Sequence, residues 1–234
     1  MFKEIIKKER KPPKHIAITT EGKIIWAKRN KKELEESFKK SFTIIKELIT
    51  AQVKYDIPIT TFYLLSTDIK ELEQFSAVID YYKEFFEKIA DDEEIQKNKI
   101  KITVLGKWYD LPGRIVEPIK KMIENTKDYD SFFINFCMNY DGQEEIVDAC
   151  KLIARMVKNE KINIDSINKN TIKDNVYSSY FMPPELIIKN GIRKVTSGLL
   201  LWDSPFTTIY FSEKLWPDFK KEDFEKGIRY FQKN

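Results

Sequence analysis

The polar residues that could do chemistry in this chain lie where its apolar segments end. Five such segments are followed by Glu21-Gly22, Ser66-Thr67, Gly106, Asn139-Tyr140 and Lys189. If these segments are parallel strands, their carboxyl ends meet at one edge of the sheet, where open α/β proteins bind ligands. Lys189 near Ser197 could form an anion site there. The more common alternative for Lys189 is an ordinary surface lysine. For Glu21 it is a solvated carboxylate at the end of a strand.

The apolar segments alternate with stretches of helical periodicity. Strand-like runs are predicted at residues 15–20, 59–66, 100–105, 131–138, 186–188, 199–202 and 207–211. Helices are predicted over residues 31–54, 68–91, 111–125, 143–157 and 222–232, with a short polar helix or turn at 165–174. This alternation indicates an α/β fold in which helices flank a mostly parallel central sheet. We expect a basic leader, residues 1–13, followed by a single domain, residues 14–234.

Composition narrows the classes of function. The 234 residues include 41 basic and 37 acidic side chains, and this mixed charge does not favour nucleic-acid binding. No apolar run approaches the length of a membrane span. The N-terminal segment is too charged for a signal peptide, so a cytoplasmic protein is expected. Peripheral membrane contact stays open, because Phe2, Ile5 and Ile6 lie among lysines in the leader. Cys137 and Cys150 are predicted to be buried, reduced thiols.

Two blocks of sequence follow the pattern of a known family. From Pro184 to Phe219 the chain reads PELIIKNGIRKVTSGLLLWDSPFTTIYFSEKLWPDF. Near the N-terminus it reads HIAITTEGKIIWA, starting at His15. The first run resembles the last block of the cis-prenyltransferases, the undecaprenyl diphosphate synthase family, including its Leu-Trp-Pro-Asp-Phe ending. The second resembles the family's His-x-Ala-Ile-x-x-Asp-Gly-Asn-Gly-Arg-Trp-Ala. The resemblance covers almost the whole chain and implies the single-domain cis-prenyltransferase fold.

The resemblance also implies roles for individual residues. Such enzymes ionise an allylic diphosphate beside isopentenyl diphosphate, which requires Mg²⁺, diphosphate donors and a slot for the growing chain. Glu21 falls at the essential aspartate, and the diphosphate-binding positions fall on Gly22, Lys189 and Ser197. The hydrophobic tunnel would be lined by Phe75, Ile79, Tyr82 and Phe86. The dimer interface would contain Trp202, Phe206, Tyr210, Phe211 and Trp216. Ordinary core packing explains the tunnel stripe almost as well.

Most charged residues of the family pattern are replaced here. The second glycine falls on Ile24, three arginines fall on Ile25, Gln143 and Val195, and the metal-ligating glutamate falls on Thr208. Another family arginine falls on Lys189. An arginine replaced by an aliphatic residue removes a bidentate phosphate donor. We therefore expect a chain that is inactive alone and carries no metal or other cofactor, with Mg²⁺ required if it is active.

These losses resemble the non-catalytic subunits of heteromeric cis-prenyltransferases, which are related to the Nogo-B receptor. The favoured hypothesis is an accessory subunit that forms a heterodimer with a catalytic subunit. The pair would make a long-chain polyprenyl diphosphate for glycosyl carrier lipids such as dolichol. A second hypothesis is an active, Mg²⁺-dependent transferase that uses Glu21, with self-association into a homodimer as the alternative assembly. A third is a protein that binds prenyl diphosphates without chemistry.

Overall fold

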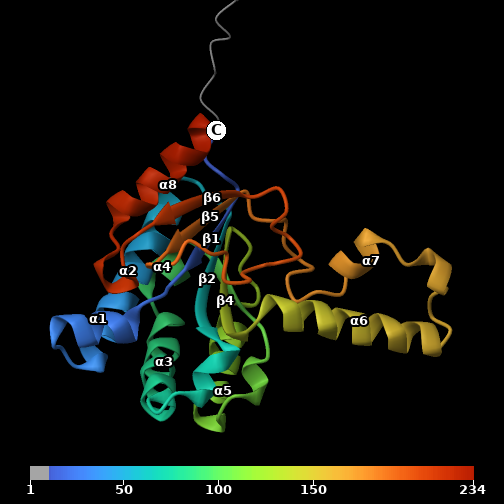
Figure 1. Cartoon of the computed structure of the whole chain (residues 1–234), viewed down its shortest axis with the longest axis horizontal. Helices are drawn as coiled ribbons and strands as arrows, with labels where there is room; N and C mark the ends of the chain where they lie inside the picture. The colour runs from blue at the N-terminus through green and yellow to red at the C-terminus, as the bar shows by residue number, and fades with distance from the viewer. Residues whose placement is uncertain (1–10) are drawn as a thin grey trace, which may run out of the picture.

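The computed structural model describes residues 11–234, which form a central sheet with helices packed on it (Figure 1). The possible lipid contact of Phe2, Ile5 and Ile6 lies outside the described residues. The strands are β1 (His15–Thr19), β2 (Ile59–Ser66), β3 (Ile100–Leu105), β4 (Phe132–Tyr140), β5 (Leu186–Asn190) and β6 (Thr208–Ser212). Their order is β3-β4-β2-β1-β5-β6, and every neighbouring pair is parallel. The predicted α/β fold with a parallel sheet is confirmed.

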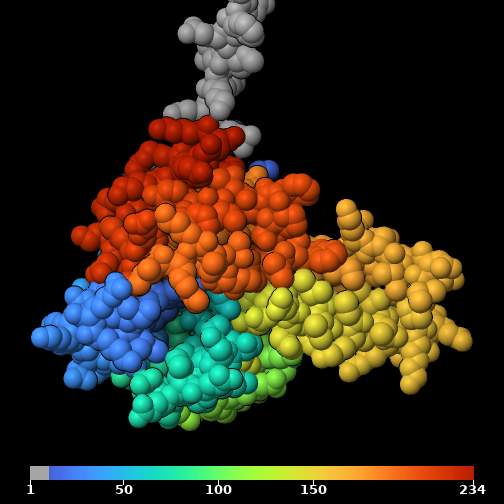
Figure 2. Space-filling model, in the orientation of Figure 1, coloured from blue at the N-terminus to red at the C-terminus, as the bar shows by residue number. Residues whose placement is uncertain are grey.

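Helices cover one face of the sheet and extend beyond it. They are α1 (Lys23–Asn30), α2 (Leu34–Lys54), α3 (Phe75–Ile89), α4 (Glu93–Lys97), α5 (Gly113–Thr126), α6 (Gly142–Lys158), α7 (Lys169–Lys173) and α8 (Lys221–Lys233). The large core joins apolar residues of α2, α3, α5 and α8 to one face of the strands. A smaller cluster on the other face is covered by the segments around Tyr177 and Leu200. The helices α6 and α7 form an arm that projects from the body (Figures 1 and 2).

Several predicted boundaries were wrong. The predicted strand at 199–202 is a turn, because Ser197, Gly198 and Leu200 have φ angles of 57°, 71° and 48°, in the left-handed region. The predicted helix at 68–91 is split into a 3₁₀ helix, Thr67–Glu71, and α3. The short helices α1 and α4 were missed. Both cysteines are free, but Cys150 is exposed rather than buried, because it lies on the outer side of the arm.

No helix within residues 11–234 combines the length and apolar character needed to cross a bilayer.

A ladder of buried polar side chains crosses four strands. Thr103 on β3 donates to Asn135 Oδ1 on β4 over 2.6 Å, and Asn135 Nδ2 donates to Thr61 Oγ1 on β2 over 3.0 Å. The Thr61 hydroxyl then donates to His15 Nε2 on β1 over 2.8 Å, and His15 Nδ1 donates to the Met182 carbonyl over 2.6 Å. Because an unmade bond inside the sheet is costly, the ladder fixes strand register as well as His15 orientation.

The buried imidazole makes stability depend on pH. Burial lowers the pKa of His15 from 6.5 to about 4, with the Met182 carbonyl partly opposing the shift. The unfolded chain therefore binds more protons between these two pH values, so stability falls as pH falls from 6.5 through 4. We expect His15 to contribute a loss of about 3 kcal/mol in the free energy of unfolding across this window.

Urea denaturation of the wild type and of His15→Asn measures this loss. The variant keeps a hydrogen-bonding side chain but lacks the titrating ring, while the carboxylates titrate in both proteins. The wild type should lose more stability than the variant between neutral pH and pH 4. Parallel pH profiles for the two proteins would contradict the prediction.

Candidate active site

A cavity of about 680 Å³ opens at the carboxyl ends of β1 and β2. Figure 2 shows it as a hollow between the blue α1 region, the teal segment after β2 and the orange C-terminal loops. Its polar lining consists of Glu21 and Lys23 within the cavity and of Ser66, Thr67, Asp68, Asp141, Arg193 and Ser197 at its rim. Its apolar wall contains Ile24, Ile25, Phe38, Leu64, Leu65, Ile69, Leu72, Val78 and Tyr82. The sheet edge predicted to bind ligands therefore carries a cavity that is charged at one side and apolar at the other.

Glu21 is held in place by its own loop. Gly22 follows it with a φ of 96°, and the Leu215 side chain would lie 2.5 Å from any Cβ at this position, so only glycine fits without strain. The Glu21 amide donates to Asn190 Oδ1 over 3.0 Å. The Glu21 carbonyl accepts a bond of 2.9 Å from the Trp216 amide. The turn between β1 and α1 is thereby tied to the C-terminal part of the chain.

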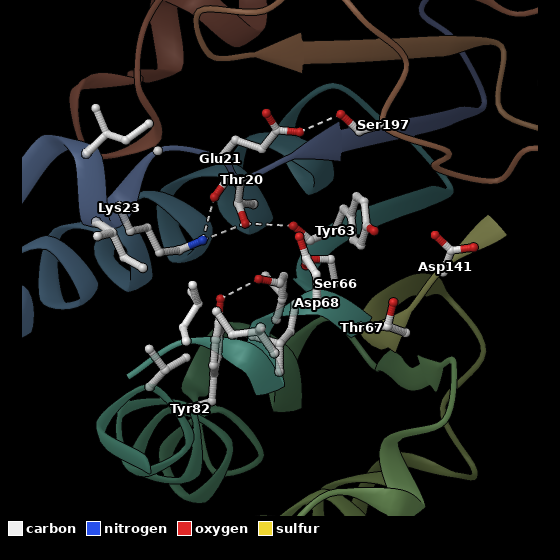
Figure 3. A pocket seen from close by; sticks show the side chains of 18 of the residues that line it. Thr20, Glu21, Lys23, Tyr63, Ser66, Thr67, Asp68, Tyr82, Asp141 and Ser197 are labelled. Atoms are coloured by element: carbon white, nitrogen blue, oxygen red, sulfur yellow. Dashed lines mark hydrogen bonds between the residues drawn. The ribbon is translucent and has the colours of Figure 1, made fainter. Parts of the chain in front are cut away.

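The Glu21 carboxylate has a partner on each oxygen. Lys189 Nζ lies 2.6 Å from Oε2. The Ser197 hydroxyl donates to Oε1 over 2.6 Å, as Figure 3 shows. The Lys189 side chain is 0% exposed and also donates to the Asn190 carbonyl, whereas the Glu21 side chain is 35% exposed. Glu21 and Lys189 are thus an ion pair at the base of the cavity rather than the two solvated side chains that are the common outcome at strand ends.

The donor set around Glu21 does not fit Mg²⁺. A metal ion ligated by Glu21 would lie beside the Lys189 ammonium, and two like charges at such short range repel strongly. Octahedral Mg²⁺ also requires several oxygen ligands at about 2.1 Å. Residues 11–234 contain no group of three or more His, Cys, Asp or Glu side chains placed to hold a metal. Thr208 lies within β6 and is not part of the cavity lining.

A second lysine lies inside the cavity, and no pattern in the sequence marks it as a site residue. Lys23, in the first turn of α1, is 7% exposed, and its ammonium points toward Thr20 (Figure 3). Its ammonium donates to the Thr20 carbonyl over 2.5 Å and to Thr20 Oγ1 over 2.8 Å. It also lies 5.8 Å from the Phe38 ring centroid and 6.0 Å from that of Tyr82.

The surroundings of Lys23 change its acid strength. Burial lowers the pKa of Lys23 to about 7, although the negative charge of Glu21 acts in the opposite direction. Burial likewise raises the pKa of Tyr82, whose hydroxyl donates to the Leu64 carbonyl over 2.6 Å. Among the described residues no carboxylate forms an ion pair with Lys23, so its charge is available to a ligand.

Comparison with known proteins identifies the family. Residues 20–234 match the family model described as putative undecaprenyl diphosphate synthase. A tritrans,polycis-undecaprenyl-diphosphate synthase (geranylgeranyl-diphosphate specific) from Thermoplasma volcanium is 32% identical over 223 residues, covering 94% of this chain and 86% of that protein. An isoprenyl transferase from Prochlorococcus marinus is 35% identical over 224 residues, covering 94% of this chain and 81% of that protein. The chain belongs to the undecaprenyl diphosphate synthase family.

The fold agrees with this membership. Lavandulyl diphosphate synthase from Lavandula x intermedia, solved in complex with dimethylallyl diphosphate, superposes with a TM-score of 0.90 at 23% sequence identity. The match covers 95% of this chain and 96% of that chain. The cis-prenyltransferase fold expected from the two sequence blocks is therefore confirmed. At 23% sequence identity, this match is evidence for the fold and not for the activity.

The structure brings some of the diphosphate-binding positions of the family together and separates others. Glu21, Gly22 and Ser197 line the cavity. Lys189 does not line it, because its ammonium lies behind Glu21 in the sheet. Ile25 and Val195, which the sequence resemblance places at arginine positions of the family, lie on the cavity wall as exposed aliphatic side chains. Arg193 also lines the cavity and supplies a cation from the loop after β5.

The residues predicted for the tunnel divide in the same way. Tyr82 lines the cavity, but Ile79 and Phe86 are fully buried in the main core and Phe75 packs against that core. The helix α3 turns Val78 and Tyr82 toward the cavity, whereas Phe86 stacks on Tyr82 one turn farther along the helix and Ile79 lies in the main core. Of the four residues predicted to line the tunnel, one therefore lines the cavity and three pack in or against the core. Core packing was the alternative explanation for this apolar pattern.

The predicted aromatic interface is also only partly at the surface. Phe206 is fully exposed and Phe211 is 37% exposed, at the side of the edge strand β6. Trp202 and Tyr210 are half-buried. Trp216 is 0% exposed and stacks on Phe219 at a centroid distance of 5.1 Å, so it is a core residue within the chain.

Proposed function

We propose that this chain is a non-catalytic, accessory member of its family that pairs with a catalytic homologue. The pair would make a long-chain polyprenyl diphosphate that serves as a glycosyl carrier lipid. One observation carries the proposal: the carboxylate at the family's aspartate position, Glu21, is neutralised by the buried Lys189 ammonium and capped by Ser197. Such a carboxylate is a poor ligand for Mg²⁺.

The chemistry of the reaction supports this proposal. Ionisation of an allylic diphosphate places growing negative charge on the leaving group, which the family stabilises with a metal ion and positively charged donors. In this cavity Ile25 and Val195 offer no donor, and Lys189 is sealed behind Glu21. Loss of one such donor typically costs about a hundredfold to a thousandfold in rate. Several losses together leave too little stabilisation for useful turnover.

The surface offers a place for the partner. Phe206 and Tyr180, at 102% and 94% exposure, are fully solvated aromatic side chains, and Met182 and Phe211 are also exposed. The strand β6 is an edge of the sheet, and within residues 11–234 only β5 pairs with it. Exposed aromatic side chains and unpaired strand edges are both typical of protein interfaces. The relatives in the comparison are named as synthases or transferases, so a catalytic homologue is the partner of choice.

The test measures isopentenyl diphosphate incorporation into geranylgeranyl diphosphate with Mg²⁺. The purified chain is assayed alone and again mixed with the most similar family member from the same organism that keeps the aspartate and arginines. We expect no turnover by the chain alone and at least about a tenfold increase in the partner's turnover on mixing. A Phe206→Glu variant should lose this increase and co-elution with the partner, because it places a charge in the interface.

Two results would overturn the proposal. The second candidate function is an active transferase, which the 32% identity to a named synthase favours. Metal-dependent turnover by the chain alone, lost in the Glu21→Gln variant, would establish that function. A stable homodimer with no effect on any intact homologue would exclude the accessory role. Glu144→Gln on the exposed face of α6 is a suitable control, since it removes a surface charge away from Phe206.

A further inference from the structure

The cavity combines an apolar chamber with one inward-facing ammonium, and this pairing points to a ligand. We propose that it binds a long apolar chain with a single small anionic head group, a carboxylate or a phosphate monoester, through the Lys23 ammonium and without a metal ion. The proposal deepens the proposed function, because a site with no turnover is free to hold such a molecule as a resident ligand or regulator.

The geometry of Lys23 supports a role in ligand binding. An ammonium has three N–H donors, and Thr20 accepts two of them at 2.5 Å and 2.8 Å. The third has no acceptor among residues 11–234, although the side chain is 93% buried, as its 7% exposure implies. A buried charge without a counter-ion is costly, and an anion in the cavity would remove that cost.

The nearby carboxylate does not serve as the counter-ion of Lys23. Both Glu21 oxygens are engaged, Oε2 by Lys189 and Oε1 by Ser197. Glu21 and Lys189 therefore cancel each other at the base of the cavity. Lys23 is left as the buried cation, with Arg193 as a second cation at the exposed rim.

Counting charges around the cavity favours a head group of low charge. Once the pair of Glu21 and Lys189 is set aside, the lining holds two cations, Lys23 and Arg193, and two carboxylates, Asp68 and Asp141. Asp68 accepts a bond from Ser66, and Asp141 accepts bonds from the Gln143 and Glu144 amides near the start of α6, so both carboxylates are held at the cavity. A diphosphate, with two or more negative charges, would meet these carboxylates with no metal to offset them.

The remaining wall suits an aliphatic chain. Phe38, Leu64, Ile69, Val78 and Tyr82 surround the chamber, and Ile25 and Leu72 are apolar residues exposed at its opening, 44% and 39%. A volume of about 680 Å³ falls within the range of roughly 300–1,000 Å³ found for small-molecule sites. Lys23 stands between this chamber and the polar rim, where the head group of an amphiphile would lie.

The test is calorimetric titration in EDTA with four probes that share a chain and differ in head group. These are farnesyl phosphate, farnesoic acid, farnesol and farnesyl diphosphate. We expect both singly headed anions to bind more tightly than farnesol and farnesyl diphosphate. Whichever of phosphate and carboxylate binds more tightly identifies the natural head group. Lys23→Met should weaken binding of the favoured anion by about tenfold to a hundredfold, the worth of one hydrogen bond to a charged group, and leave farnesol affinity unchanged.

The control keeps the result interpretable. Lys28→Met changes an exposed lysine of the same helix outside the cavity and should bind every probe as the wild type does. Farnesol binding by Lys23→Met shows that the variant is folded and its chamber intact. Equal anion affinity in the two variants, tighter binding of the diphosphate than of the other anions, or no binding of any probe would overturn the proposal. Because the titration uses the chain alone, its failure is separate from failure to stimulate a partner.

Discussion

Replacement of Glu21 by alanine is expected to lower the free energy of unfolding by about 3–5 kcal/mol, the usual cost of breaking a buried ion pair from one side. The variant leaves the Lys189 ammonium, which is 0% exposed, with the Asn190 carbonyl as its remaining acceptor.

The opposite replacement should cost less. Lys189→Met leaves a carboxylate that is 35% exposed and still accepts a bond from Ser197, so water can solvate it. We expect a loss of about 1–2 kcal/mol. In the double variant both charges are absent, and its stability should exceed that of Glu21→Ala alone.

Urea denaturation of the three variants measures this asymmetry. A Glu21→Ala variant that is no less stable than Lys189→Met would show that the ammonium is not trapped behind the carboxylate. That outcome would also remove the argument that Glu21 is unavailable to a metal ion.

The same ion pair shows where sequence reasoning stops. The strands at residues 59–66 and 100–105 were predicted with the bounds that β2 and β3 have, because their apolar runs end at clear breaks. Parallel strands covered on both faces read as continuous apolar runs, which locates a strand but not the direction of its side chains. Lys189 is the penultimate residue of β5, and its burial depends on Glu21, 168 positions earlier in the chain. No local pattern carries that pairing.

The missed elements have local reasons. The helix α1 has eight residues and two adjacent isoleucines, too short for a periodic pattern to stand out. The burial of Lys23, in this helix, could not be predicted because lysine is almost always exposed. Its surroundings include the Phe38 and Tyr82 rings, which come from other parts of the chain. The predicted strand at 199–202 failed because apolar residues there fill a turn with left-handed backbone at Leu200. An apolar run reports burial and does not by itself report extended backbone.

A large loss of stability is also expected where the first turn of α6 packs against the loop that carries Ser197. Gly142 is the first residue of α6, and a Cβ added there would lie 2.1 Å from the Gly198 carbonyl oxygen and 2.8 Å from Leu201 Cβ. Gly198 follows Ser197, the residue that donates to Glu21. Because the obstacle is backbone, it cannot turn aside as a flexible side chain would. We expect Gly142→Ala to destabilise the fold by about 3 kcal/mol through forced movement of this loop.

Gly113→Ala provides the matched comparison. Gly113 is also the first residue of a helix, α5, but a Cβ there meets nothing within 4 Å. This variant should be neutral or more stable by about 0.4–1 kcal/mol, because alanine restricts the unfolded chain more than glycine does. Equal stability of the two variants would show that the loop yields freely to α6.

Hydrogen exchange tells whether the lost stability of Gly142→Ala arises at this junction. The Leu200 amide donates to the Tyr140 hydroxyl over 3.1 Å, and that hydroxyl donates to Glu145 of α6 over 2.5 Å. If the loop moves, the Leu200 amide loses its acceptor and should exchange faster in Gly142→Ala than in Gly113→Ala, while amides of β2 keep their relative protection. Uniform acceleration across the sheet would indicate global destabilisation instead. In that case the Ser197 hydrogen bond to Glu21 would not depend on how α6 packs.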